Sequence, residues 1–330
     1  MSDKIVTLSI GGGGKQTSSF IKDIILKNFN NDIIDNLGDA SHIKTDSLSA
    51  FTTDSFVIRP EFFNGGNIGK LSICGTVNDL AVSGARPEYL SFALVVAEGY
   101  SLNDLEKIVE SAAEEAKKAG VKIVCGDTKV VERGGIDGVI INTCGVGRVI
   151  KNLNDYASIE VGDKVIITSD IARHGMAVML GRGEFGFSGN IESDCACLNH
   201  MMEEVYPYNV KFSRDATRGG VAAVLNEIAE KSGKGFIIHE EDIPLRQDVA
   251  ELCDTLGYDP LSVANEGAAV IIVSDDHHEK VLDIIRNTET GKNAKVIGSV
   301  TNNNKVILDT ISGGKRHIDL PPGELLPRIC

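Results

Sequence analysis

The sequence predicts an α/β (α+β) protein of two domains followed by a C-terminal tail. A chain of 330 residues is too long for one ordinary hydrophobic core, and its 42% hydrophobic content is enough for two. Alternating apolar residues, typical of strands, and apolar residues at helical spacing occur in both halves of the chain. A polar stretch at 151–162 separates the halves, so we expect domains at 1–150 and 151–308 and a flexible tail at 309–330.

The first half begins with a strand, a glycine run and a helix. Residues 3–10 alternate as a strand, and the run from Gly11 to Gly14 cannot be regular structure, which makes it a loop. Ser101 is a good N-cap and Gly120 a good C-cap, so a long helix is expected between them. Apolar spacing predicts helices at 21–29 and 68–81 and strands at 47–51, 54–58, 89–97, 121–125 and 138–149.

The second half repeats this mixture of elements without repeating the sequence. Helices are expected at 174–182, 195–205, 218–232 and 246–256, and strands at 164–168, 235–239, 268–273, 294–300 and 305–309. The periodicity ends after Asp309. Beyond it, glycines and prolines are expected to keep the chain extended and mobile, and about twenty residues at roughly 3.3 Å each would carry the thiol of Cys330 tens of ångströms.

Composition excludes several classes of protein. The formal charge of −14 argues against a nucleic-acid binder, which needs a basic face to neutralise phosphates. No apolar run approaches the roughly 18 residues of a membrane span, and the N-terminus leads directly into a strand pattern. We therefore expect a cytoplasmic protein that binds neither nucleic acid nor membrane.

The seven cysteines are odd in number, scattered and mostly set in apolar runs, as reduced buried thiols are. Cys195 and Cys197 form the only close pair. With no second pair and only His200 nearby, two small side chains at a helix start are favoured over a metal site.

Four aspartates, each at a turn, a strand edge or a helix of small residues, indicate cation chemistry: Asp39, Asp54, Asp79 and Asp127. Asp79 is the most informative because an unpaired carboxylate in its apolar helix would cost several kcal/mol to bury, so a cation should face it. A surface carboxylate on the polar face of that helix is the alternative. Carboxylate oxygens gathered around a glycine-rich loop suit Mg²⁺ and polyphosphate.

The bare amides of Gly11 to Gly14 could contact phosphates, but the loop matches neither common nucleotide fingerprint. Lys15 is followed by Gln16 instead of Ser or Thr, so the P-loop spacing fails. Gln16 also occupies the third glycine position of a dinucleotide-binding motif. By itself, the run is equally compatible with a loop that binds nothing.

The second half adds three groups that could take part in chemistry. Residues 213–220 hold two arginines and Asp215 before a glycine-opened helix, which suits a metal-phosphate contact, with an ordinary capped helix start as the alternative. Glu266 lies in a tight turn before a buried strand, which suits a base or a plain turn. Lys129 would place a cation beside whatever Asp127 binds, or be a solvated strand lysine.

Taken together, these motifs resemble the HypE family of hydrogenase maturation factors along the whole chain. The residues that carry the resemblance are Thr53-Asp54-Ser55, Asn78-Asp79-Leu80-Ala81, Gly126-Asp127-Thr128, Asp215-Ala216-Thr217-Arg218-Gly219-Gly220 and the terminal Pro327-Arg328-Ile329-Cys330. The inner motifs are shared with the wider PurM-like superfamily, which includes aminoimidazole ribonucleotide synthetase, selenophosphate synthetase and thiamine phosphate kinase. The terminal Pro-Arg-Ile-Cys is specific to HypE.

The resemblance implies a two-domain PurM-like fold whose N-terminal domains, each with a mixed sheet, form a homodimer and bind ATP with Mg²⁺. It implies that a carbamoyltransferase, HypF, loads a carbamoyl group onto Cys330. The enzyme, a carbamoyl dehydratase, then dehydrates the thiocarbamate to a thiocyanate. The cyanide passes to iron on a HypC–HypD scaffold and becomes a ligand of [NiFe]-hydrogenase.

The resemblance also implies a role for each motif residue. Cys330 would carry the substrate, while Glu266 and Lys129 are candidates for base and charge stabiliser, with their roles open between them. The expected Mg²⁺ ligands are Asp39, Asp54, Asp79 and Asp215. The expected ATP contacts are Gly11, Gly12, Gly13, Thr53, Asn78, Asp127, Thr128 and Arg218.

Two other functions remain alternatives on these residues. One is another PurM-like ATP-dependent kinase or synthetase acting on a small molecule, against which the tail argues. The other is a nucleotide-sensing adaptor whose tail is a docking peptide, which would bind partners without any covalent adduct on Cys330.

Overall fold

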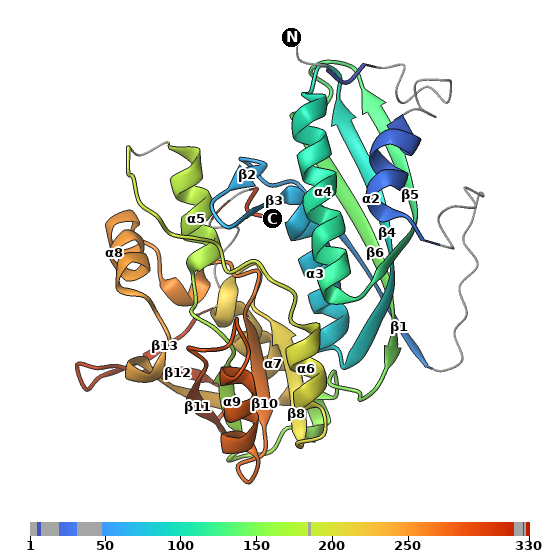
Figure 1. The fold of residues 1–330 in the computed structure, drawn as a ribbon. Coiled ribbons are helices and arrows are strands. Elements are labelled where there is room, and N and C mark those ends of the chain that lie inside the picture. The colour runs from blue at the N-terminus through green and yellow to red at the C-terminus, as the bar shows by residue number, and fades with distance from the viewer. Residues whose placement is uncertain (1–4, 8–19, 32–47, 184–185, 320–325, 327) are drawn as a thin grey trace.

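A computed structural model of the chain describes residues 5–7, 20–31, 48–183, 186–319, 326 and 328–330. The molecule has two lobes, each with its own sheet and helices (Figure 1). In the described residues no helix is long and apolar enough to cross a membrane.

The first lobe is built on a four-stranded sheet covered on one face by two helices. Its strand order is β1-β6-β4-β5, in which β4 and β5 run parallel and the other pairs antiparallel. The strands are β1 (Ser49–Phe56), β4 (Ala85–Ala97), β5 (Lys122–Val131) and β6 (Val139–Val149). Helices α3 (Ile68–Val82) and α4 (Leu102–Ala119) pack against each other and against the sheet (Figure 1).

The ends of these two helices follow from local chemistry. Asn67 begins α3 because its side-chain oxygen accepts hydrogen bonds from the backbone amides of Gly69 and Lys70. Ser101 caps α4 in the same way, and Gly120 ends it in the left-handed conformation that favours glycine. Nearby lie a π-helical turn (Ile21–Leu26), α2 (Lys27–Phe29), β2 (Phe62–Phe63) and β3 (Gly66–Asn67).

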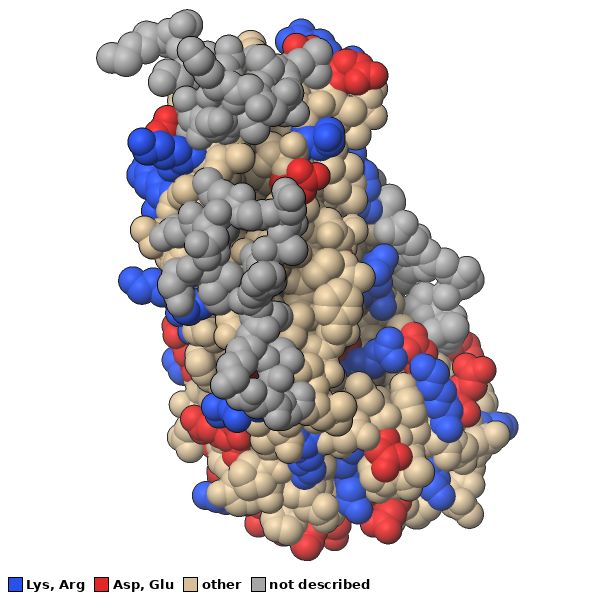
Figure 2. Space-filling model, turned by 90° about the vertical axis from the view of Figure 1, so that its right-hand side faces the viewer, with Lys and Arg blue, Asp and Glu red and all other residues tan. Residues whose placement is uncertain are grey.

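Two large apolar side chains are exposed on β1 and just before it. Leu48 and Phe51 are 75% and 70% exposed. In Figure 2 the first lobe is at the top, and much of its visible surface is uncharged, with Lys and Arg mostly toward the margins. Large apolar side chains exposed in this way are typical of surfaces that contact a partner.

The second lobe contains a seven-stranded sheet of order β13-β12-β9-β11-β7-β10-β8. Its strands are β7 (Lys164–Ile167), β8 (Val210–Asp215), β9 (Gly235–His239), β10 (Ala269–Val273), β11 (Lys295–Thr301), β12 (Val306–Asp309) and β13 (Lys315–His317). Its helices are α5 (Arg173–Arg182), α6 (Asn199–Val205), α7 (Gly220–Ser232), α8 (Gln247–Leu256) and α9 (His278–Arg286). Every residue of β10 is buried, as expected for a strand inside a sheet covered on both faces.

Several elements differ from the sequence-based expectation. The segments 47–51 and 54–58, expected as two strands, form the single strand β1, which pairs with β6 without a register shift. Asp215 ends strand β8 and does not lie in a loop. Helix α9 and strands β8 and β13 were not predicted. Most of the strand expected at 3–10 lies outside the described residues.

The segment expected to be an extended, mobile tail is partly structured. β13 pairs antiparallel with β12, and Ile318 is buried. Leu326 and Ile329 are also buried, with 4% and 2% of their surface exposed. The expectation rested on the absence of periodicity, but these apolar side chains find cover against distant parts of the fold, which local sequence does not show.

Candidate active site

A cavity of about 650 Å³ lies between the lobes and is lined by residues from both. The first lobe contributes Asp54 from β1 and Asp79 from α3. The second contributes Asp215, Arg218 and Glu266, and the chain terminus contributes Cys330. The structure therefore brings together six of the residues predicted from sequence, across more than 270 positions of the chain.

Asp79 faces the cavity from the otherwise buried helix α3. Its carboxylate accepts a hydrogen bond of 2.7 Å from the hydroxyl of Thr52, on β1. Burial raises the pKa of Asp79, whereas the Thr52 hydroxyl and the positive charge of Arg214 act to lower it. The positive charge of Arg214 comes from the second lobe, where its guanidinium pairs with Glu227 at 2.7 Å.

The three aspartates disfavour each other's charge. Burial and then the charge of Asp79 raise the pKa of Asp54, against the attraction of Arg218. The same two causes raise the pKa of Asp215 to about 7. Carboxylates that raise one another's pKa in this way are ionised together more easily when a cation binds, and their hard oxygen atoms suit Mg²⁺. The donor set therefore fits a magnesium site.

Glu266 is 3% exposed, and burial raises its pKa well above the usual range, with the neighbouring Cys195 as the second cause. Its backbone is held on both sides, because its amide donates to the carboxylate of Asp194 and its carbonyl accepts from the Asn78 side chain. Gly267 is required here, since a Cβ at this position would lie 1.8 Å from the carbonyl oxygen of Asp194. This contact explains the Asn-Glu-Gly turn.

The chain terminus lies beside the segment that follows β1. The amide of Val57 donates to the carbonyl of Cys330 at 3.1 Å, and the amide of Arg59 donates to the carbonyl of Arg328 at 3.1 Å. These bonds hold Cys330 where it lines the cavity that Asp54 and Glu266 also line.

His174, which was not predicted, holds the same terminus from α5. Its Nε2 lies 2.7 Å from the carbonyl oxygen of Ile329, and its Nδ1 lies 2.8 Å from the hydroxyl of Ser193. Burial lowers the pKa of His174, so the ring is neutral. A carbonyl can only accept, so Nε2 carries the proton and Ser193 donates to Nδ1. No sequence signal marks this histidine, which sits alone in an apolar helix.

The remaining predicted residues lie elsewhere. Asn78 is buried and binds the backbone of Ala196 and Leu198 instead of lining the cavity. Thr53 points to the opposite side of β1 from Thr52 and Asp54, where its hydroxyl donates to the carbonyl of Thr143.

Strand β5 carries three more of the predicted residues, Asp127, Thr128 and Lys129, at the edge of the sheet farthest from β1, and none of them lines the cavity. Their roles stay predictions. Gly11, Gly12, Gly13 and Asp39 lie outside the described residues.

The chain resembles known proteins over its whole length. Residues 37–149 match the N-terminal domain and residues 160–310 the C-terminal domain of the AIR synthase related protein family. The carbamoyl dehydratase HypE of Rhodobacter capsulatus is 42% identical over 100% of this chain and 99% of its own length. The chain belongs to the HypE family. The PurM-like fold predicted from the sequence is thereby confirmed.

Two solved structures contain a HypE protein together with a ligand or a partner protein. A HypE in complex with ATP has a TM-score of 0.94 and 37% identity, covering 98% of this chain and 99% of its own. A HypE in a HypE–HypF complex has a TM-score of 0.81 and 44% identity, covering 92% of this chain and 100% of its own. One HypE protein thus binds ATP, and one assembles with HypF.

Replacing the histidine that holds the terminus should expose Cys330. In His174→Ala the carbonyl of Ile329 loses its donor, which costs about 1–3 kcal/mol for a buried acceptor. We expect iodoacetamide to alkylate Cys330 about tenfold faster in this variant, measured by mass spectrometry of the C-terminal peptide. His200→Ala is the matched control, because His200 also contacts a backbone carbonyl, that of Lys118, but lies away from the tail. Equal rates in the two variants would show that His174 does not hold the terminus.

Proposed function

We propose that this protein dehydrates a carbamoyl group carried on its own Cys330 to a thiocyanate, at the expense of ATP. The observation that carries the proposal is the position of the terminal residue Cys330, which lines one cavity with Asp54, Asp79, Asp215 and Glu266. The names of the relatives support it, since they are carbamoyl dehydratases. The cyanide would serve as a ligand for [NiFe]-hydrogenase.

The reaction moves one oxygen atom from the substrate to phosphate. The amide oxygen of the carbamoyl group attacks the γ-phosphorus of ATP, and ADP leaves with the bonding electron pair. The carbon–oxygen bond then breaks with phosphate as the leaving group, while the nitrogen loses two protons. The products are the thiocyanate on Cys330, ADP and phosphate, so no free water is formed and no electrons are exchanged.

The carboxylates of Asp54, Asp79 and Asp215 would hold Mg²⁺ in this cavity, with Asp39 as a further ligand. The ion would neutralise charge on the triphosphate. Arg218 lines the same cavity and would bind phosphate oxygens. The amides of Gly11 to Gly13 and residues Thr53, Asn78, Asp127 and Thr128 remain proposed contributors to ATP binding.

Glu266 is the better candidate for the base, because it lines the cavity with Cys330 and Lys129 does not. Its raised pKa makes the ionised carboxylate a strong proton acceptor, and it acts on the nitrogen protons directly or through a water molecule. Lys129 remains a proposed charge stabiliser.

The proposal includes partners. HypF would load Cys330, as the HypE–HypF complex of a relative suggests, and a HypC–HypD complex would receive the cyanide. A homodimer would form through the exposed face of the first sheet, where Leu48 and Phe51 are uncovered, and light scattering would report its mass. None of the seven cysteines, all of which the structure describes, forms a disulfide, which fits the cytoplasmic setting expected from sequence.

Removing the terminal thiol should abolish the reaction and leave the fold intact. The protein is incubated with a HypF-type carbamoyltransferase, carbamoyl phosphate and ATP, and its C-terminal peptide is measured by mass spectrometry. The mass of the peptide should first rise by one HNCO unit and then fall by one water. Cys330→Ser should show neither change while retaining ATP binding. Cys125→Ser, which removes an exposed thiol from β5, should behave as the wild type. Normal partner binding with no adduct on Cys330 of the wild type would favour the adaptor alternative.

Neutralising Glu266 should slow turnover without weakening ATP binding. We expect Glu266→Gln to lower kcat by about 10²- to 10⁴-fold, the usual contribution of a positioned base. In the wild type, kcat should rise with pH as the raised pKa of Glu266 is approached, and this rise should be absent in the variant. The control is Glu279→Gln, an exposed substitution on α9. An unchanged kcat would remove Glu266 from the mechanism.

Binding of magnesium-ATP should weaken as the pH falls through about 7. Because the pKa of Asp215 is raised to about 7, its carboxyl gains a proton below that pH and can no longer ligate a cation. We expect the Kd to rise about tenfold from about pH 8 to about pH 6, measured by titration calorimetry. In Asp215→Asn binding should be weak at both values, and a pH dependence as large as that of the wild type would contradict the assignment.

A further inference from the structure

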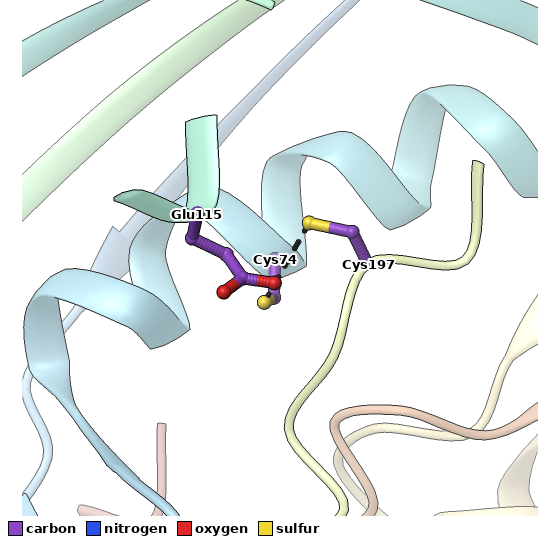
Figure 3. A group of neighbouring side chains, drawn as sticks. All are labelled: Cys74, Glu115 and Cys197. Atoms are coloured by element: carbon purple, nitrogen blue, oxygen red, sulfur yellow. Dashed lines mark hydrogen bonds between the residues drawn. The ribbon is translucent and has the colours of Figure 1, made fainter. Parts of the chain in front are cut away.

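Three side chains with metal-binding atoms meet between the lobes, away from the residues that line the active-site cavity. They are Cys74 on α3, Glu115 on α4 and Cys197 in the segment before α6, and their ligand atoms all lie within 4.8 Å of one another. Figure 3 shows the Glu115 carboxylate and the Cys197 sulfur directed toward the sulfur of Cys74 from different elements. In the part of the chain that the structure describes, no other group meets this criterion.

The distance between the two sulfur atoms distinguishes a metal site from a disulfide. Cys74 Sγ and Cys197 Sγ are 3.7 Å apart. Zinc–sulfur bonds of about 2.3 Å in tetrahedral geometry place two thiolates about 3.8 Å apart, whereas a disulfide requires about 2.05 Å. The thiols therefore already have the separation that a tetrahedral ion would impose.

Burial and charge support the same conclusion. Cys74 is 0% and Glu115 6% exposed, and a carboxylate is seldom buried so deeply without a function or a partner. Glu115 forms an ion pair with the ammonium group of Lys118, at 3.3 Å, and the side chain of Lys118 is 69% exposed. Two thiolates and one carboxylate around a divalent ion carry one net negative charge, which Lys118 would balance.

We propose that Cys74, Glu115 and Cys197 bind a zinc ion that joins the helices of the first lobe to the segment preceding α6. Binding forms two zinc–sulfur bonds and one zinc–oxygen bond and releases the two thiol protons to solvent, with no change of oxidation state. A water molecule on the side where Cys197 is partly exposed would fill the fourth position, beside the side chain of Cys195, which interacts with that of Cys74.

The site would stabilise the peptide that supports Glu266. The Asn78 side chain donates to the carbonyl of Ala196 at 3.0 Å, and the amide of Ala196 donates to the carbonyl of Glu266 at 3.4 Å. The amide of Gly267 donates to the Asp194 carboxylate at 2.9 Å. An ion at Cys197 would hold this short segment at its far end, so its role is structural.

The test is a titration of the reduced, full-length protein with Co²⁺, which reports thiolate ligation by its charge-transfer absorption and is displaced by zinc. The titration is done in the Cys330→Ser background to remove the thiol of the active-site cavity. We expect one ion per chain with a thiolate absorption band, and a Kd at least about tenfold weaker in Cys197→Ser and in Glu115→Gln. Cys144→Ser, which removes another partly exposed thiol, should bind as tightly as the parent.

Three results would overturn the proposal. They are the absence of a thiolate band in the parent protein, equal affinity in Cys197→Ser and Cys144→Ser, and a Cys74–Cys197 disulfide found by peptide mapping of the protein purified without reductant. Thermal unfolding of the parent protein is a second measurement, which does not depend on whether a variant folds. Zinc should raise the Tm of the parent, and a chelator should reverse the rise. No shift on adding zinc would also count against the site.

Discussion

The burial of helix α3 on all sides is the constraint on which the rest of the structure depends. Thirteen of its fifteen residues are buried, so the helix has almost no solvent-facing stripe. The sheet and α4 of the first lobe cover one side, while α6 and β8 of the second lobe cover another. Because a helix that is apolar all round is stable only inside a protein, the two lobes must pack against each other around it. This packing fixes where the cavity can be.

The polar residues of α3 therefore occur only where a specific partner exists. Asn78 satisfies the backbone of the segment before α6, and Asp79 contacts Thr52 and faces Arg214. Burying a carboxylate costs several kcal/mol unless a cation or a hydrogen bond offsets it. Three carboxylates in one cavity raise that cost, because like charges disfavour one another. The negative charge of these carboxylates suits a positively charged ligand.

The C-terminal residues are held in place by contacts with the rest of the protein. A chain end normally frays, because few contacts offset the entropy of ordering it. Here Ile329 is buried, and the carbonyl groups of Arg328, Ile329 and Cys330 each accept a hydrogen bond from the body of the protein. These contacts hold the terminus beside the segment that follows β1.

The sequence by itself determined the class of fold, most helices and strands, and the family. It also identified Asp54, Asp79, Asp215, Glu266 and Cys330, because their residue types and local settings carry a chemical signal. Helical and strand periods are local properties, so α3 and α4 could be predicted within a few residues. Strands β8 and β13 and helix α9 were missed, because their signals are short or weak without their neighbours.

Only the tertiary structure decided which of these residues meet. Thr52 lines the cavity and contacts Asp79, whereas the hydroxyl of Thr53 is held by the carbonyl of Thr143 on the paired strand β6. Lys129 is remote from Glu266 because β5 lies at the opposite edge from β1. His174 and the Cys74–Glu115–Cys197 group join residues distant in sequence. Strand order and lobe packing arise from long-range contacts, which no window along the chain contains.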